Sequence, residues 1–172
     1  MENRRHQRVH SASPSVAGIG LSAAGLTLAR SAHAAGSETI RMALVGCGNR
    51  GTGACREALL AKAPVRLVAL GDLFAERMET SLKNLTKYAD LKPKIDVPAE
   101  RMFAGFDAYQ KVLASGVDLV LFATPPHFRP LHYAAAVKAG KHVFMEKPLC
   151  VDAPGYRMLV AANEEARKKK LS

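Results

Sequence analysis

The hydrophobic positions of this 172-residue chain fall into short apolar runs that alternate with stretches of helical spacing. Runs rich in β-branched and aliphatic residues predict buried strands over residues 40–45, 65–70, 117–122 and 141–145. Between and after these runs, apolar side chains recur every three or four residues, which predicts helices over residues 51–63, 73–88, 106–114, 130–139 and 154–170. Residues 90–101 are polar and contain two prolines, so we expect mostly loop there.

Several residues mark where the predicted helices begin and end. Pro64 stops the first helix, Asp107 is placed to cap the third, Gly140 closes the fourth, and Pro154 fits the first turn of the last. Strands that are apolar throughout and separated by helices are typical of parallel β-α-β units covered on both faces. The pattern therefore predicts an α/β fold, with the Met and Phe residues at these spacings in its core.

The first 36 residues differ from the rest and predict an export signal. Arg4, Arg5 and Arg8 form a basic start, an apolar run of small residues and leucines covers residues 16–29, and the triplet at 32–34 matches a small-x-small cleavage site. The run is shorter than the roughly 20 residues that a membrane-spanning helix needs, so we expect no stable span. The Arg4-Arg5 pair suggests the twin-arginine route, although His6, Gln7 and Arg8 stand where hydrophobic residues usually follow; an ordinary signal remains open. We expect a periplasmic protein whose folded part covers residues 37–172.

Composition narrows the function classes. The formal net charge is +10, and 48% of the residues are hydrophobic, enough for a packed core rather than a disordered chain. The basic leader and a cluster at residues 167–170 carry much of the excess, and no aromatic interleaving accompanies them, so we expect no nucleic acid partner. Cys47, Cys55 and Cys150 have no metal-ligand spacing, so we expect packing roles for them and no metal.

The strongest chemical signal is a glycine loop at the end of the first predicted strand. Residues 46–51 read G-C-G-N-R-G, the G-x-G-x-x-G pattern of Rossmann-type dinucleotide sites. Gly46 permits the tight turn, Gly48 lets the backbone approach a pyrophosphate, and Gly51 lets the helix pack closely. Asn49 and Arg50 complete the loop, where free N–H groups at the helix start favour phosphate.

An acidic residue is expected about 20 residues further on, at the end of the second strand, to bind the adenosine ribose. Asp72 lies 21 residues after Gly51. A carboxylate there would repel a 2′-phosphate, which favours NAD, while Arg77 nearby leaves NADP open. A methyltransferase loop is the main chemical alternative, and the prolines after the strand at 117–122 argue against it.

Residues 123–153 carry a family resemblance. The run T-P-P-H at 124–127, then A-G-K-H-V at 139–143 and E-K-P-L at 146–149, closely resembles the Gfo/Idh/MocA oxidoreductases, as do the glycine loop and Gly71-Asp72. The resemblance covers about residues 38–170, the N-terminal half of that family. The leader resembles the exported glucose–fructose oxidoreductase-like branch.

The resemblance implies hydride transfer between NAD or NADP and a hydroxyl-bearing carbon, usually of a sugar or cyclitol. It implies that Lys147 is the catalytic residue beside the substrate hydroxyl and also lies at the cofactor, and that Glu146 contacts the nicotinamide-side ribose. Thr124, Pro125 and His127 would line the cofactor, whereas a surface-loop role for His127 stays equally open. The proline of the E-K-P motif, Pro148, is often cis in such enzymes. We interpret His132 and His142 as structural.

Family enzymes also have a second, substrate-binding domain that supplies further catalytic groups, and this chain shows no counterpart of it. We therefore expect a doubly wound parallel sheet truncated before the sixth strand of a 3-2-1-4-5-6 order, with the fifth strand as an exposed edge. Whether such a chain turns over substrate is uncertain. The alternative is a non-catalytic dinucleotide-binding module that works with a separate substrate-domain chain or as a homo-oligomer.

Overall fold

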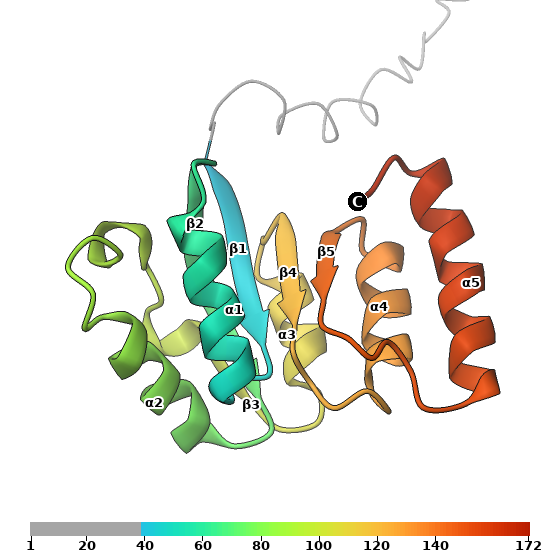
Figure 1. Ribbon diagram of the computed structural model, residues 1–172, viewed down its shortest axis with the longest axis horizontal. Coiled ribbons are helices and arrows are strands. Elements are labelled where there is room, and N and C mark those ends of the chain that lie inside the picture. Colours follow the sequence, from blue (N-terminus) through green and yellow to red (C-terminus); the bar gives the residue numbers. More distant parts are fainter. Residues whose placement is uncertain (1–38) are drawn as a thin grey trace, which may run out of the picture. The chain divides into compact units, whose positions relative to one another are not determined.

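The computed structural model describes residues 39–172, and the predicted leader lies outside them. Five parallel strands form one sheet in the order β3-β2-β1-β4-β5 (Figure 1). The strands are β1 (Ile40–Val45), β2 (Val65–Asp72), β3 (Met102–Ala104), β4 (Leu119–Phe122) and β5 (His142–Met145). The helices are α1 (Asn49–Leu60), α2 (Ala75–Leu85), α3 (Ala108–Ala114), α4 (Arg129–Lys138) and α5 (Ala153–Lys168). The predicted Rossmann-type α/β fold is confirmed.

The register of the strands brings their carboxyl ends to one edge of the sheet. Val45 of the central β1 pairs with Gly71 on one side and with Phe122 on the other. Further out, Asp72 pairs with Ala104 and Phe122 pairs with Met145. The loops that follow all five strands therefore lie along a single edge, the lower one in Figure 1.

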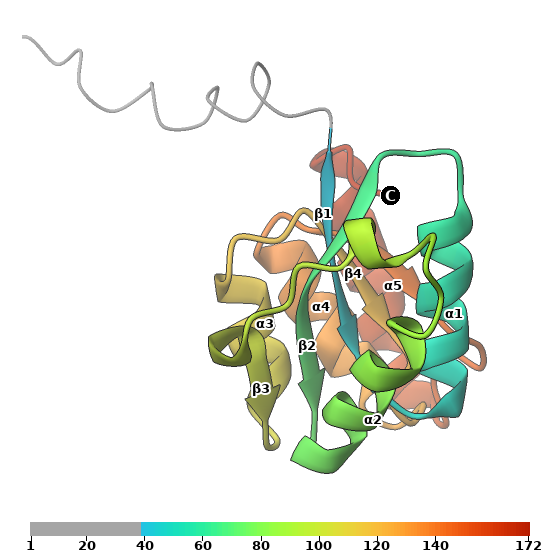
Figure 2. The same ribbon diagram turned by 90° about the vertical axis from the view of Figure 1, so that its left-hand side faces the viewer.

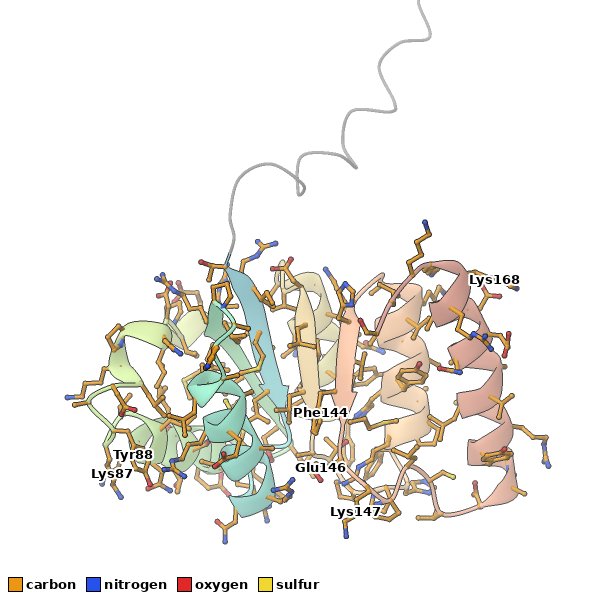
Figure 3. All side chains as sticks on the ribbon, turned by 45° about the horizontal axis from the view of Figure 1, so that its top comes forward. Lys87, Tyr88, Phe144, Glu146, Lys147 and Lys168 are labelled. Atoms are coloured by element: carbon orange, nitrogen blue, oxygen red, sulfur yellow. The ribbon has the colours of Figure 1, made fainter. Side chains whose placement is uncertain are left out.

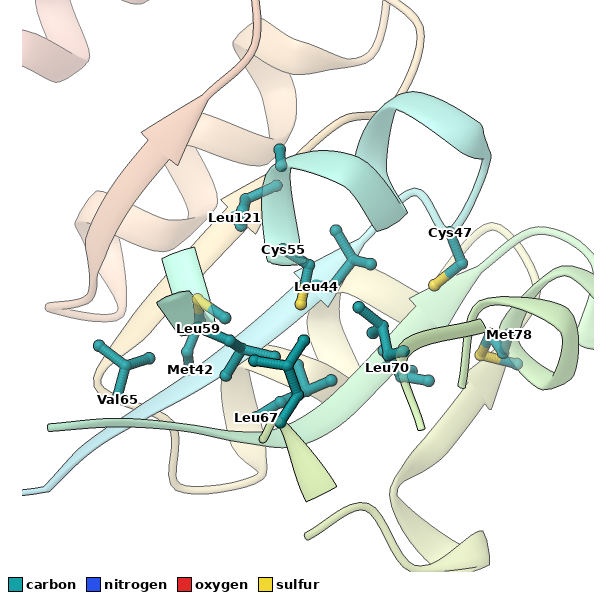
Figure 4. Close-up of a cluster of buried hydrophobic side chains, with 13 residues drawn as sticks. Met42, Leu44, Cys47, Cys55, Leu59, Val65, Leu67, Leu70, Met78 and Leu121 are labelled. Carbon is teal, nitrogen blue, oxygen red and sulfur yellow. The ribbon is translucent and has the colours of Figure 1, made fainter. Parts of the chain in front are cut away.

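The helices α1 and α2 cover one face of the sheet. Leu44 and Met42 of β1 are fully buried there, beside Cys55 and Leu59 of α1 and Met78 of α2 (Figure 4). Each buried side chain of this size contributes roughly 1.5–3 kcal/mol relative to full exposure. This cluster fixes α1, and with it the loop that joins β1 to α1.

The other face is covered by α3 and α4, opposite α1 and α2 (Figure 2), and α5 packs beside α4. Phe122 and Val120 of β4 are fully buried against Val112 of α3 and Ala136 of α4. The sheet is thus covered on both faces, as the uninterrupted apolar runs of its strands predict. Within residues 39–172, no helix is long and apolar enough to cross a membrane.

Several local predictions are confirmed. Gly140 has a left-handed φ of 70° just after α4, and Pro154 lies in the first turn of α5. That turn is capped by the Asp152 carboxylate, which accepts a hydrogen bond from Gly155 N at 2.7 Å. As predicted, β5 lies at the edge of the sheet, and it leaves Phe144 about half exposed. This edge is not fully open, because Val143 N donates to Ser172 O at 2.7 Å.

Other predictions need correction. The sequence pattern did not locate β3, which follows two short 3₁₀ turns, η1 (Lys92–Lys94) and η2 (Ala99–Arg101). Its three residues, two half-buried and one exposed, are too few to make a recognisable apolar run. Asp107 precedes α3 as predicted, but its carboxylate binds Lys111 Nζ at 3.0 Å rather than capping a backbone N–H. The expectation that the Met and Phe residues at these spacings lie in the core is wrong for Phe106, which is 74% exposed, and for Phe144 of β5 and Met158 of α5, which are 52% and 43% exposed.

Candidate functional site

The glycine loop between β1 and α1 is built so tightly that two of its glycines admit no side chain. Gly46 has φ +96°, and a Cβ there would lie 2.6 Å from the backbone of Ala123 and Thr124. A Cβ on Gly51 would lie 1.9 Å from the carbonyl oxygen of Gly46. These glycines are needed for chain packing, in agreement with the turn and helix-packing roles expected for them.

Gly48 differs, because a Cβ there would meet nothing closer than Arg77 Nη1 at 3.5 Å. Its backbone is extended, with φ −71° and ψ −177°, a conformation open to any residue. It precedes α1, whose first turn has no side-chain cap and no acidic residue. The free N–H groups of this turn, and the positive end of the helix dipole, therefore face an open approach that suits a phosphate group.

Asp72 at the end of β2 is buried, and both of its carboxylate oxygens are held by the backbone. Oδ2 accepts from Cys47 N at 2.6 Å, and Oδ1 accepts from Phe74 N at 3.1 Å. The carboxylate thus joins the glycine loop to the loop after β2. Its remaining acceptor capacity lies at the site where ribose hydroxyls are expected.

A cavity of about 360 Å³ opens beside these groups, a size typical of small-ligand sites. Its lining combines the glycine loop, Asp72 and a set of aromatic rings. The lining residues that carry the argument are Gly46, Gly48, Asp72, Phe74, Arg77, Phe106, Tyr109, Thr124, Pro125, Phe128, Arg129 and His132. Flat apolar walls next to a phosphate-binding loop and a ribose acceptor fit an adenine dinucleotide.

The loop after β4 brings Thr124 and Pro125 into the cavity lining. Thr124 Oγ1 lies 3.2 Å from Nδ1 of His132, whose ring stacks on Tyr109 at 4.2 Å. Burial lowers the pKa of His132 to about 4, so the ring is neutral at physiological pH. His127 is exposed outside the lining, with its ring edge-on to Phe128.

The E-K-P turn follows β5 at the same edge of the sheet (Figure 3). Glu146 is buried, and its carboxylate forms an ion pair with Arg50 of α1, which holds the pKa of Glu146 below its ordinary value. Lys147 is exposed, and its side chain extends away from the body of the protein in Figure 3. The Lys147–Pro148 peptide bond is cis, as the resemblance implies.

The predicted site residues therefore fall into two groups. Gly46, Gly48, Asp72, Thr124 and Pro125 line the cavity together. The others lie outside its lining: Asn49 and Arg50 are exposed on the first turn of α1, Gly51 is packed beneath the loop, and His127, Glu146 and Lys147 follow β4 and β5. Their functional roles remain predictions.

Sequence reasoning missed the aromatic wall and the buried Arg129 of α4, and it interpreted His132 as structural without placing it at the cavity. The ring centres of Phe106 and Phe128 lie 6.4 Å apart in the cavity lining. The sequence feature that could have indicated this wall is an aromatic residue just past a strand end. Arg129 and His132 stand within the resembling segment, but their bonds to the backbone and to Thr124 follow from no motif.

Two of the three cysteines fit the packing roles predicted for them, whereas Cys150 is only partly buried. Cys47 and Cys55 are buried, and burial raises the pKa of both thiols, that of Cys55 to about 12. Cys47 Sγ is 3.5 Å from the carbonyl oxygen of Gly71. Among residues 39–172, no cluster of three His, Cys, Asp or Glu side chains is arranged to hold a metal ion.

Known proteins resemble this chain in sequence and in architecture. A "Glycosyl hydrolase family 109 protein" of Streptomyces coelicolor is 29% identical over 76% of this chain and 26% of its own length. The inositol 2-dehydrogenase of Azotobacter vinelandii is 29% identical over 76% of this chain and 35% of its own length. The crystal structure of the WlbA dehydrogenase of Bordetella pertussis in complex with NADH and UDP-GlcNAcA matches with a TM-score of 0.57 and 25% identity, over 76% of this chain and 34% of that one.

The chain thus spans about a quarter to a third of the length of these relatives. The family model described as "Oxidoreductase family, NAD-binding Rossmann fold" matches residues 40–172, which include the glycine loop, Asp72 and the E-K-P turn. The chain belongs to the Gfo/Idh/MocA oxidoreductase family and comprises its NAD-binding Rossmann domain.

Proposed function

We propose that this chain is the cofactor-binding part of an NAD-dependent oxidoreductase that moves a hydride to or from a hydroxyl-bearing carbon of a sugar or cyclitol. The observation that carries the proposal is the shared edge of the sheet, where the glycine loop, Asp72 and the E-K-P turn meet. The relatives named inositol 2-dehydrogenase and the WlbA complex with a nucleotide sugar support this substrate class.

The residues of the chain divide the work between binding and proton transfer. The N–H groups of the first turn of α1 bind the pyrophosphate, Asp72 accepts from the ribose hydroxyls, and the aromatic wall holds the adenine. A bound nicotinamide supplies the hydride acceptor or donor. As the neutral amine, Lys147 Nζ would take the hydroxyl proton as the C–H hydride leaves, becoming an ammonium, and would return the proton in the reverse direction.

NAD is favoured over NADP because Asp72 presents a fixed negative charge where a 2′-phosphate would lie. In the cavity lining, Arg77 favours NADP. Its guanidinium lies 5.5 Å from the centre of the Phe74 ring and next to Gly48, within the same cavity. The two hydrogen bonds to Asp72, one buried and one partly buried, keep the carboxylate in place, which supports repulsion of a 2′-phosphate as the larger effect.

A non-catalytic dinucleotide-binding module is the second candidate. The edge strand β5 and helix α5 expose apolar residues, among them Phe144, Tyr156 and Val160, each at least 45% exposed. Exposed apolar surface of this kind suits contact with a separate substrate-domain chain or a second copy. Hydride transfer by the chain alone would exclude this candidate, whereas activity that needs an added partner would support it.

The proposed cofactor is tested by titrating NADH and NADPH into the purified chain while following nicotinamide fluorescence. We expect saturable binding of NADH at least about tenfold tighter than that of NADPH, a difference of about 1.4 kcal/mol. Asp72→Asn removes the charge and should narrow this ratio, with thermal unfolding as the check that the variant folds. A ratio unchanged by Asp72→Asn would contradict the assignment of Asp72, and no saturable change with either nucleotide would refute the site.

We also propose that the N-terminal segment directs export to the periplasm, as its basic start, apolar run and small-x-small triplet indicate. These residues lie outside the described part of the chain. N-terminal sequencing of the protein from a periplasmic fraction should find a start near Ala35. Replacing Arg4 and Arg5 by lysine should abolish export only if the twin-arginine route is used.

A further inference from the structure

Arg129 is a buried cation that ties two loops of the site together. It is the first residue of α4 and is only 6% exposed. Its Nε donates to the carbonyl oxygen of Thr124 at 2.6 Å, while Nη1 donates to the carbonyl oxygen of Glu146 at 2.7 Å and also to that of Pro148. One side chain thus joins the loop after β4 to the turn after β5.

The position of Arg129 is unfavourable by the usual rules of helix and core stability. A cation at the first position of a helix opposes the helix dipole. The hydrogen-bond acceptors found for this guanidinium within residues 39–172 are backbone carbonyls, so no carboxylate forms a direct ion pair with it. Burial lowers the pKa of Arg129, and the nearby charge of Glu146 offsets this only in part. Residues that break local rules in this way are typical of functional sites.

The two carbonyls held by Nη1 flank Lys147 on both sides. Glu146 O precedes that residue and Pro148 O follows it, so the backbone that carries Lys147 is fixed while its side chain reaches solvent (Figure 3). The Glu146 carboxylate is held separately by Arg50. The turn is therefore anchored at its backbone by α4 and at its side chain by α1.

We infer that Arg129 is a positioning residue that sets the turn bearing Lys147 against the cofactor-lining loop at Thr124. This inference rests on the proposed nicotinamide site. Arg129 itself lines the cavity, so the link between the two loops runs along the wall of the binding site. A guanidinium reaches acceptors in two directions from one planar group, whereas the single ammonium of a lysine cannot bond Thr124 O and the Glu146–Pro148 pair in the same geometry.

The experiment compares Arg129→Lys, Arg129→Met and a control, Arg157→Met, which alters an exposed arginine of α5. Two affinities are measured for each protein, one for NADH and one for ADP, which lacks the nicotinamide half. Amide hydrogen exchange of the peptide covering residues 145–150 is recorded alongside the urea midpoint. We expect both Arg129 variants to bind NADH at least about fivefold more weakly, ADP within about twofold of the unaltered chain, and residues 145–150 to exchange faster than the rest of the protein.

Three results would overturn the inference. Equal losses of NADH and ADP affinity with a lowered urea midpoint would show that Arg129 only stabilises the fold. NADH affinity retained by Arg129→Lys would show that a positive charge at this position is enough and that the guanidinium geometry is not needed. Unchanged exchange at residues 145–150 would show that it does not hold the turn. Failure of the unaltered chain to bind NADH would refute the proposed function instead, and the exchange measurement would then still decide whether Arg129 fixes the turn.

Discussion

The three glycines of the loop at residues 46–51 and the next glycine of α1 have different surroundings, so substituting them separates folding from cofactor binding. In Gly51→Ala the new Cβ would lie 1.9 Å from Gly46 O, a contact that forces α1 away from β1. We expect a loss of about 3 kcal/mol in the free energy of unfolding, at the upper end of overpacking costs. Gly53→Ala places its Cβ in open space within α1 and should raise stability by about 0.5–1 kcal/mol.

Gly48→Ala is the informative change. Its Cβ would contact only Arg77 Nη1 at 3.5 Å, an ordinary van der Waals distance, and the extended backbone accepts alanine. We expect the free energy of unfolding to stay within about 0.5 kcal/mol of the unaltered chain. The methyl group, however, occupies the space through which a pyrophosphate must approach the backbone. NADH affinity should fall at least about tenfold, or about 1.4 kcal/mol.

Urea unfolding and NADH titration of the three variants form the assay. Gly53→Ala is the matched control, since it adds the same methyl group five residues further on, inside α1. Gly48→Ala with unchanged stability and unchanged NADH affinity would refute the placement of the pyrophosphate at this loop. Gly51→Ala with unchanged stability would refute the packing derived for α1.

Two further predictions concern titratable groups. Because burial keeps the pKa of His132 at about 4 rather than 6.5, the unfolded chain takes up a proton between these values that the folded chain does not. The free energy of unfolding should therefore fall by up to about 3 kcal/mol as the pH drops from 6.5 to 4. Urea titrations of His132→Phe should lack this part of the pH dependence. An equal pH dependence of stability in both proteins would contradict the prediction. Burial also raises the thiol pKa of Cys47 and Cys55. A disulfide reagent at pH 8 should therefore modify Cys150 rapidly, and Cys47 and Cys55 only after unfolding. Rapid reaction of all three thiols in the native protein would be inconsistent with the packing.

The fold could be predicted from the sequence where apolar runs are continuous and bounded by glycine or proline. β1, β2 and β4 have such runs because both of their faces are covered. The short apolar run of β5 was also recognised, although His142 and Phe144 are exposed on this edge strand. The observed strand ends differ from the predicted ones where the strand continues past its apolar run, as at β2, which extends to Asp72. β3 escaped detection because a strand of three residues at the edge of the sheet buries too little apolar surface to leave a pattern.

The candidate site was predictable only as far as backbone chemistry dictates residue type. Gly46 and Gly51 have to be glycine for steric reasons, and Asp72 has to stand at the end of the second strand to reach the loop. Arg129 could not be found in this way, because its acceptors are carbonyl oxygens, which every residue has, and two of them lie 17 and 19 positions away. The exposed aromatic residue Phe106 was assigned to the core because hydrophobicity alone does not distinguish a core residue from a cavity wall.

The most direct test of the central claim is an amide chemical-shift titration of the chain with NADH. The account predicts saturable shifts at the carboxyl edge of the sheet, largest at Gly48, Asn49, Phe74 and Thr124. It predicts none at the opposite edge around Arg66. Saturable shifts confined to that opposite edge, or no shifts at NADH concentrations that saturate related domains, would contradict the placement of the dinucleotide across the glycine loop.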